Sequence, residues 1–373
     1  MSRRRRNITH YLGKNKKVCD RILNAQRNLY AKLAKLDLRL LGISEYNQRY
    51  LSDKIKIAEA SLQRCGKLLE LAINSVSVDL DDIVLVDYGG GSGFISFLAK
   101  QIGIGTVIYN DVYDVSCADV KCLSKELGLN LEHVVCADID GLVEYLNNNS
   151  ITITTMVSYD VIEHIYDVAD YFNKLSSLSN NAFTLIYGSG ANIENPWYVQ
   201  SIRQKQIDAE TKNRTKEWGH KKRDSLNAYC EIRREIINTY APELNKEQIE
   251  HLAINTRGLI KSDIIKYIDE YRTNGSITYH IEHPTNTCDP ITGNWCEHLM
   301  NLSWLEQTVK KAGFSVEIVA GYEPLSNLLI RKAIDFIRII LRGYMFISSY
   351  YVVYASCSPI KRQKETDFEI RNL

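Results

Sequence analysis

The sequence has 373 residues, which is enough for one large α/β domain with additions or for two domains. Its 45% hydrophobic and 24% charged residues are typical of a globular protein, and a net charge of +1 gives no overall reason to expect nucleic acid or anionic lipid as a partner. Nine cysteines, an odd number at irregular spacing, indicate reduced thiols and therefore a cytoplasmic location.

The chain begins with a basic segment, MSRRRR, and no apolar stretch follows it, so it is not a secretory signal. Such an arm either binds RNA or a membrane surface or is a solvated tail; the tail is favoured, because chain termini are usually loosely held. Leu and Ile then recur every three to four residues without proline, which predicts helices at 18–42 and 45–73. Together these segments form a predicted helical N-terminal extension, 1–78.

Residues 79–190 alternate between short β-branched or aromatic runs and helical stretches. The predicted strands are 83–86, 106–109, 133–136, 152–157 and 183–187. The predicted helices between and after them are 94–102, 115–127, 141–147 and 167–178. This alternation predicts a parallel sheet with helices on both faces.

The alternation stops near residue 190, and 191–300 is polar, charged and mostly helical. About 110 residues are too many for an ordinary loop, so this insertion is predicted to be a helical subdomain or a lid over an acceptor. The α/β pattern resumes in 301–373, which is expected to complete the core. That part contains a predicted helix at 302–312 and predicted strands at 315–320 and 349–355.

One apolar helix is predicted at 328–342. With Lys332 it has five charged residues, too many for a membrane-spanning segment, and the other four, Arg331, Asp335, Arg338 and Arg342, fall in one narrow stripe. The remaining surface of this helix must be covered by protein or touch a membrane. Protein cover is favoured, since helices of α/β folds are mostly buried, and peripheral contact with the inner face of the membrane stays the alternative.

The segment 86–93 reads VDYGGGSG, a glycine-rich loop between a predicted strand and a predicted helix. A phosphate-binding P-loop is excluded, because no Lys-Ser or Lys-Thr pair follows the glycines. The dinucleotide fingerprint is weakened, because it would place Phe94 where a small residue allows close helix–strand packing. The loop therefore favours close backbone approach by a ligand other than a phosphate.

The spacing that fits is D-x-G-x-G-x-G at Asp87, Gly89, Gly91 and Gly93, which resembles the first motif of class I S-adenosylmethionine-dependent methyltransferases. The segment SYDVIEHI at 158–165 is similar to the D/E-V-L-E-H segment of the ubiquinone-biosynthesis O-methyltransferase subgroup. The resemblance covers about 80–190 and 300–357. It implies a Rossmann-like seven-stranded sheet with helices on both faces and an antiparallel last strand.

The resemblance also implies S-adenosylmethionine as the cofactor. Asp111 would accept hydrogen bonds from the ribose hydroxyls, and Asp138 would lie beside the adenine amino group, with Asp140 as a competitor. Asp87 would either fix the backbone of the glycine loop or contact the methionine amino group. The expected cofactor-binding residues are Asp87, Gly89, Gly90, Gly91, Gly93, Asp111, Val112, Asp138, Ile139 and Tyr159.

Methyl transfer needs an acceptor lone pair held in line with the methyl carbon, and a hydroxyl acceptor must also lose its proton. His164, just past the fourth strand, is the predicted base, because histidine titrates near neutral pH. Glu163 or Asp160 would orient it. Alternatively, Glu163 and His164 only cap or pack this loop, and the base comes from elsewhere.

The insertion holds a second cluster of chemically active residues between 279 and 298. The spacing of its His and Cys residues matches no standard zinc pattern, so no metal is expected. We predict instead a loop that lines the acceptor pocket, and a base from this loop competes with His164. The expected acceptor contacts are His280, His283, Asp289, Trp295 and His298.

These features predict an O-methyltransferase for a small-molecule, glycan or lipid-linked acceptor. An RNA methyltransferase is disfavoured by the near-zero net charge and by the lack of a recognisable RNA-binding module. A non-catalytic, cofactor-binding regulatory module is a further alternative. The sequence identifies neither the acceptor nor an oligomeric state.

Overall fold

The structure is a computed structural model that describes residues 15–178, 182–214, 225–321 and 345–357. Its core is a seven-stranded sheet of order β3-β2-β1-β4-β5-β7-β6, in which the first five strands are parallel and β7 is antiparallel to both neighbours. The strands are β1 (Val84–Tyr88), β2 (Thr106–Asp111), β3 (His133–Cys136), β4 (Thr155–Tyr159), β5 (Phe183–Ser189), β6 (Ser315–Ala320) and β7 (Tyr351–Cys357). This confirms the predicted fold class.

The strand order reverses between β1 and β4. Strand β1 pairs on one side with β2, the next strand in the chain, and on the other side with β4. In open α/β sheets such a reversal leaves a crevice outside the carboxyl ends of the strands. The glycine loop follows β1 directly, so the fold places it at the edge of this crevice.

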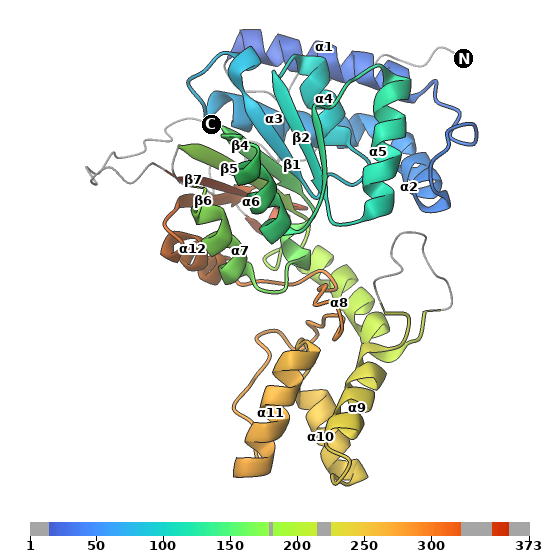
Figure 1. Ribbon diagram of the computed structural model, residues 1–373, viewed down its shortest axis with the longest axis vertical. Helices are drawn as coiled ribbons and strands as arrows, with labels where there is room; N and C mark the ends of the chain where they lie inside the picture. Colours follow the sequence, from blue (N-terminus) through green and yellow to red (C-terminus); the bar gives the residue numbers. More distant parts are fainter. Residues whose placement is uncertain (1–14, 179–181, 215–224, 322–344, 358–373) are drawn as a thin grey trace.

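Both faces of the sheet are covered, as the alternation predicted. Leu85 of β1 packs into the apolar core on one face, and its neighbour Val86 packs into the core on the other. The first face carries α3 (Ala58–Asn74), α4 (Phe94–Ile102) and α5 (Asp114–Leu127), and the second carries α6 (Ile139–Asn148), α7 (Val168–Ser176) and α12 (Leu302–Lys311). Figure 1 shows these layers around the sheet.

The N-terminal helices differ from the two predicted ones. Helix α1 (Lys16–Leu33) ends earlier than expected, and the Asp37 carboxylate accepts a hydrogen bond of 3.1 Å from the Arg39 backbone N–H, a local turn that competes with helix. The second predicted helix is divided at Ile57, whose backbone is not helical, into α2 (Glu45–Lys56) and α3. Helix α1 packs on α3 and α4, and α3 contacts β4 and β5.

The insertion is helical, as predicted, with α8 (Pro196–Thr211), α9 (Tyr229–Tyr240), α10 (Lys246–Asn255) and α11 (Lys261–Asn274). Helices α9, α10 and α11 enclose a small apolar core of their own and project away from the sheet (Figure 1). After α11 the chain returns beside α8 to the sheet, where Gln206 Nε2 donates to Asn286 Oδ1 at 2.9 Å. The boundaries predicted for the four parts of the chain stay predictions.

Two predicted features, the basic arm at 1–6 and the apolar helix at 328–342, lie outside the described residues. Of the helices that the structure does describe, none combines the length and the apolar character needed to cross a bilayer.

Candidate functional site

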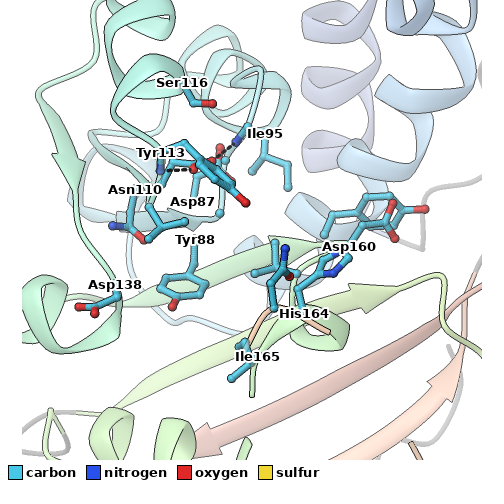
Figure 2. Close-up of a pocket in the computed structure, with 18 of the residues that line it drawn as sticks. Asp87, Tyr88, Ile95, Asn110, Tyr113, Ser116, Asp138, Asp160, His164 and Ile165 are labelled. Atoms are coloured by element: carbon cyan, nitrogen blue, oxygen red, sulfur yellow. Dashed lines mark hydrogen bonds between the residues drawn. The ribbon is translucent and has the colours of Figure 1, made fainter. Parts of the chain in front are cut away.

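A cavity of about 820 Å³ opens at the carboxyl ends of β1, β2, β3 and β4, where the strand order reverses. The glycine loop, helices α2 and α3, and the insertion residues 292–294 and 297 also line it. Figure 2 shows Asp138 and Tyr88 toward one end of this cavity and Asp160 and His164 toward the other. The fold thus brings the ends of four strands to one binding site.

The glycine loop is tightly packed on the side away from the cavity and open on the side that faces it. Gly89 has φ +67°, and a Cβ there would lie 2.5 Å from Cγ2 of Val161. Gly91 has φ +51°, yet a Cβ there would meet no atom closer than the Gly89 carbonyl at 4.0 Å. Gly93 does not line the cavity, because it caps the start of α4. The loop therefore offers bare backbone to a ligand on its cavity side.

Asp87 anchors this loop to α4. Its Oδ2 accepts hydrogen bonds from the backbone N–H of Ser96 at 3.0 Å and from the Ser96 hydroxyl at 2.6 Å. Burial raises the pKa of Asp87 to about 7, although both bonds from Ser96 act in the opposite direction. This geometry favours the loop-fixing alternative of its two predicted roles.

Asp111 lies at the end of β2, directly beside the glycine loop. Its Oδ2 accepts from the Gly91 backbone N–H and its Oδ1 from the Tyr113 backbone N–H, both at 2.9 Å. The Tyr109 hydroxyl donates to the Gly91 carbonyl at 2.7 Å, so strand β2 holds the loop from two sides. Burial raises the pKa of Asp111 above its ordinary value. The exposed side chain of Val112 follows and lines the same cavity.

Asp138 and Ile139 line the far end, after β3. Asp138 caps α6, since its Oδ1 accepts from the Gly141 backbone N–H at 3.1 Å, and its side chain is exposed. Asp140, the predicted competitor, forms an ion pair of 2.7 Å with Lys174. This pairing favours Asp138 over Asp140 for contact with a ligand.

Tyr159 and Asp160 end β4 and line the cavity at its other end. Asp160 has φ +57°, a left-handed backbone that costs a non-glycine residue about 1–3 kcal/mol and that is concentrated at functional sites. Its Oδ1 accepts from the Gly190 backbone N–H at 3.0 Å. The carboxyl is open to the cavity but enclosed by surrounding protein, and this enclosure raises its pKa, while Lys54 opposes the rise.

His164 lines the cavity from the 3-10 helix η2 (Ile162–His164). Its Nδ1 lies 2.8 Å from the backbone carbonyl oxygen of Trp295. A carbonyl can only accept, so Nδ1 carries a proton, and in the neutral ring Nε2 therefore has the lone pair. The carbonyl of Trp295, rather than the predicted Glu163 or Asp160, forms the orienting hydrogen bond.

Glu163 lies away from the cavity. Its side chain is fully buried, and burial raises its pKa well above the ordinary value. Its backbone carbonyl accepts from the His298 N–H at 3.0 Å, which joins η2 to the insertion loop. Direct contact between Glu163 and a ligand in this cavity is therefore not supported.

None of the five predicted acceptor residues lines this cavity. His280 is exposed, and His283 lies 3.4 Å from Arg203. Asp289 is buried and accepts from the backbone N–H and hydroxyl of Ser225. Of these side chains, His283 and Asp289 contact other parts of the insertion rather than the cavity.

Trp295 stacks on His298 with ring centroids 4.0 Å apart, and burial lowers the pKa of His298 to about 4. The neighbouring residues of the loop face the cavity instead. The loop residues that line it are Thr292, Gly293, Asn294 and Glu297.

The N-terminal extension also lines the cavity, although none of its residues was among the predicted site residues. Helix α2 presents Tyr46, Tyr50 and Lys54 to the cavity, and α3 presents Ser61 and Arg64. The spacing of the α2 residues, i, i+4 and i+8, was the available signal, because it places polar side chains on one helix face.

The described part of the chain contains no group of three or more His, Cys, Asp or Glu side chains arranged to hold a metal ion. The side chains of the 280–298 cluster lie in the separate positions described above, so the structure offers no zinc ligand set there.

No protein-family model matches the chain, and no curated protein matches it in sequence. Among solved structures it is similar to a Listeria monocytogenes protein classed as an S-adenosylmethionine-dependent methyltransferase, at 12% identity and a TM-score of 0.38, over 79% of this chain and 96% of that one. The plantazolicin methyltransferase BpumL in complex with S-adenosylhomocysteine is similar at 10% identity and a TM-score of 0.37, over 92% and 99%.

The CurJ carbon methyltransferase is similar at 9% identity and a TM-score of 0.39, over 91% of this chain and 66% of that one. All three TM-scores lie below 0.5, so these similarities support no conclusion about function, and the proposed function rests on the site alone. The sheet order and the antiparallel β7 give this chain the Rossmann-like fold that was expected from the methyltransferase resemblance.

Proposed function

We propose that this protein is an S-adenosylmethionine-dependent methyltransferase that methylates a hydroxyl group of a small-molecule, glycan or lipid-linked acceptor. The observation that carries the proposal is the position of His164. Its Nε2 bears a lone pair in the same cavity that contains the bare backbone of the glycine loop and the carboxyl of Asp111.

The residues present fit the donor. The glycine loop leaves its front free of side chains, Asp111 offers carboxylate oxygens beside it, and Asp138 and Val112 line the end where a nucleobase would lie. A cavity of about 820 Å³ is within the range of small-molecule sites, about 300–1,000 Å³, and is open enough to accept a second reactant.

When bound, S-adenosylmethionine supplies an electrophilic methyl group. His164 Nε2 would take the acceptor hydroxyl proton as the hydroxyl oxygen bonds to the methyl carbon and the carbon–sulfur bond of that methyl group breaks, which leaves S-adenosylhomocysteine. The hydrogen bond from Nδ1–H to the Trp295 carbonyl stabilises the imidazolium that results, because the carbonyl dipole faces the new charge. The proton then leaves to solvent.

The test is methyl transfer from donor labelled in the methyl group, with hydroxyl, amine and thiol acceptors of matched size in parallel. We expect label to enter hydroxyl compounds only. Label that enters amines or thiols would contradict O-methylation, and the absence of transfer to any acceptor, despite cofactor binding, would favour the regulatory-module alternative.

A further inference from the structure

The end of the cavity beside β4 is built partly by the N-terminal helices, which the methyltransferase resemblance does not cover. Lys54 of α2 and Arg64 of α3 both line this end, next to Tyr159 and Asp160. Two cations from a segment outside the core therefore face this end of the cavity.

Helix α2 is held firmly in this place. Asp119 of α5 accepts hydrogen bonds from the Ser44 hydroxyl at 2.5 Å and from the Asn47 side-chain amide at 2.7 Å. Ser44 caps α2 and Asn47 lies in its first turn, so both bonds fix the helix that carries Lys54. The lysine is thus presented from a tethered helix and not from a loose loop.

The two ends of the cavity differ in charge. Toward β3 the wall carries Asp138, with Asp111 next along the sheet, and the one cation among the described residues that line this end, Lys174, is paired with Asp140 and Asp170. Toward β4 the wall combines the cations Lys54 and Arg64 with two carboxyls, Asp160 and Glu297, and Glu297 is paired with Lys205 at 3.1 Å. A nucleoside matches the first end, whereas a group with both a negative and a positive charge matches the second.

Both basic groups are positively charged at neutral pH. Burial alone would lower the pKa of Lys54, but the neighbouring Tyr50 and Asp160 outweigh it and raise the pKa above its usual value. The Arg64 guanidinium donates to the Tyr159 hydroxyl at 3.3 Å and lies over the Tyr350 ring at 5.7 Å, which fixes its direction.

We propose that Lys54 and Arg64 form a carboxylate-binding subsite, in which the N-terminal helices hold the α-carboxylate of an amino-acid group while Asp160 faces its ammonium. This inference rests on the proposed function and extends it. The donor is itself an amino acid joined to a nucleoside, so with its nucleoside at the β3 end its amino-acid group would face the β4 end of the cavity. An amino-acid group on the acceptor has the same chemistry and is the second source.

The test compares S-adenosylhomocysteine with its decarboxylated analogue, which keeps the thioether and the ammonium but lacks the carboxylate. Calorimetric titrations use the full chain and the variants Lys54→Met and Arg64→Met. Lys56→Met is the matched control, because Lys56 lies on the same helix, pairs with Asp53 and is exposed. Arg64→Lys keeps the charge and serves as a second variant if Arg64→Met does not fold.

We expect Lys54→Met and Arg64→Met to weaken S-adenosylhomocysteine about tenfold to a hundredfold, the range for a lost hydrogen bond to a charged group, and to leave the decarboxylated analogue unchanged. This result assigns the subsite to the donor. If instead both variants bind S-adenosylhomocysteine like wild type but lose binding of free glycine to the loaded protein, the subsite belongs to the acceptor.

Wild-type affinity of both variants for S-adenosylhomocysteine, together with unchanged binding of glycine, would overturn the inference. That outcome differs from failure of the proposed function, in which the wild-type protein itself would bind neither S-adenosylhomocysteine nor its analogue.

Discussion

The two ends of the cavity are constructed in different ways. The end beside β2 and β3 uses backbone and single carboxyls that directly follow strands, such as Gly91, Asp111 and Asp138. The end beside β4 combines side chains of α2 and α3 with an insertion loop that lies more than 100 residues further along the chain. The first end is therefore set by local sequence, and the second by packing between distant segments.

This difference matters for function. A site made from strand ends is rigid and suits a constant ligand, the nucleoside of the proposed donor. A site assembled from an extension and an insertion can change without disturbing the sheet, which suits a variable acceptor beside the amino-acid group of the donor. His164 belongs to the end beside β4, because it follows this strand and is oriented by the carbonyl of Trp295 in the insertion loop.

The largest effect is expected for His164, the proposed base. His164→Gln removes the proton acceptor, so the rate of methyl transfer should fall about 10²- to 10⁴-fold, the usual contribution of a general base. Affinity for S-adenosylhomocysteine should stay within about twofold of wild type, since no donor contact is removed. His251→Gln, at an exposed position of α10, is the control. A fully active His164→Gln would show that the base lies elsewhere.

A second change tests how the insertion supports the end of the cavity beside β4. Glu210 of α8 is buried and pairs with the fully buried Arg233, and it accepts from the Thr287 hydroxyl of the insertion loop at 2.8 Å. Glu210→Ala leaves Arg233 without its counter-ion, so the free energy of unfolding should fall by about 3–5 kcal/mol, as measured by denaturant titration.

The matched control is Glu250→Ala, which breaks the exposed pair with Arg234 and should cost at most about 1 kcal/mol. S-adenosylhomocysteine should still bind the folded Glu210→Ala protein with unchanged affinity. A large loss of that affinity would show that the two ends are not independent.

A third change tests the glycine loop, which belongs to the proposed donor site. Gly89→Ala would place a Cβ 2.5 Å from Val161, so the loop must shift, and affinity for S-adenosylhomocysteine should fall about a hundredfold, or about 2.7 kcal/mol. Gly128→Ala is the control, because Gly128 has a similar φ of +62° but open space around it at the end of α5. Equal loss of affinity in both variants would mean that general destabilisation, and not the loop, is responsible.

The same contrast explains what the sequence could predict. All seven strands and the helices between them were predicted, because each element carries its own apolar periodicity, and the glycine loop and Asp111 follow strands directly. The break at Ile57 was missed, since no proline or glycine marks it and packing of α3 on the sheet decides it.

The predicted acceptor residues show the limit of this approach. His280, His283 and Asp289 were selected for their chemistry, but the orientation of a loop side chain depends on partners far along the chain, such as Ser225 and Arg203. Lys54 and Arg64 were missed for the opposite reason: their helices had no motif, and only the tertiary structure brings them to the cavity.

The central claim is that the glycine loop and Asp111 bind the nucleoside of S-adenosylmethionine. Calorimetric titration of wild type and Asp111→Asn with S-adenosylhomocysteine tests it most directly, with Asp140→Asn as a control on a paired carboxyl in the same cavity. We expect one site in the wild-type protein, affinity about tenfold to a hundredfold weaker in Asp111→Asn, and no change in Asp140→Asn. No binding by wild type, or equal binding by all three proteins, would contradict the claim.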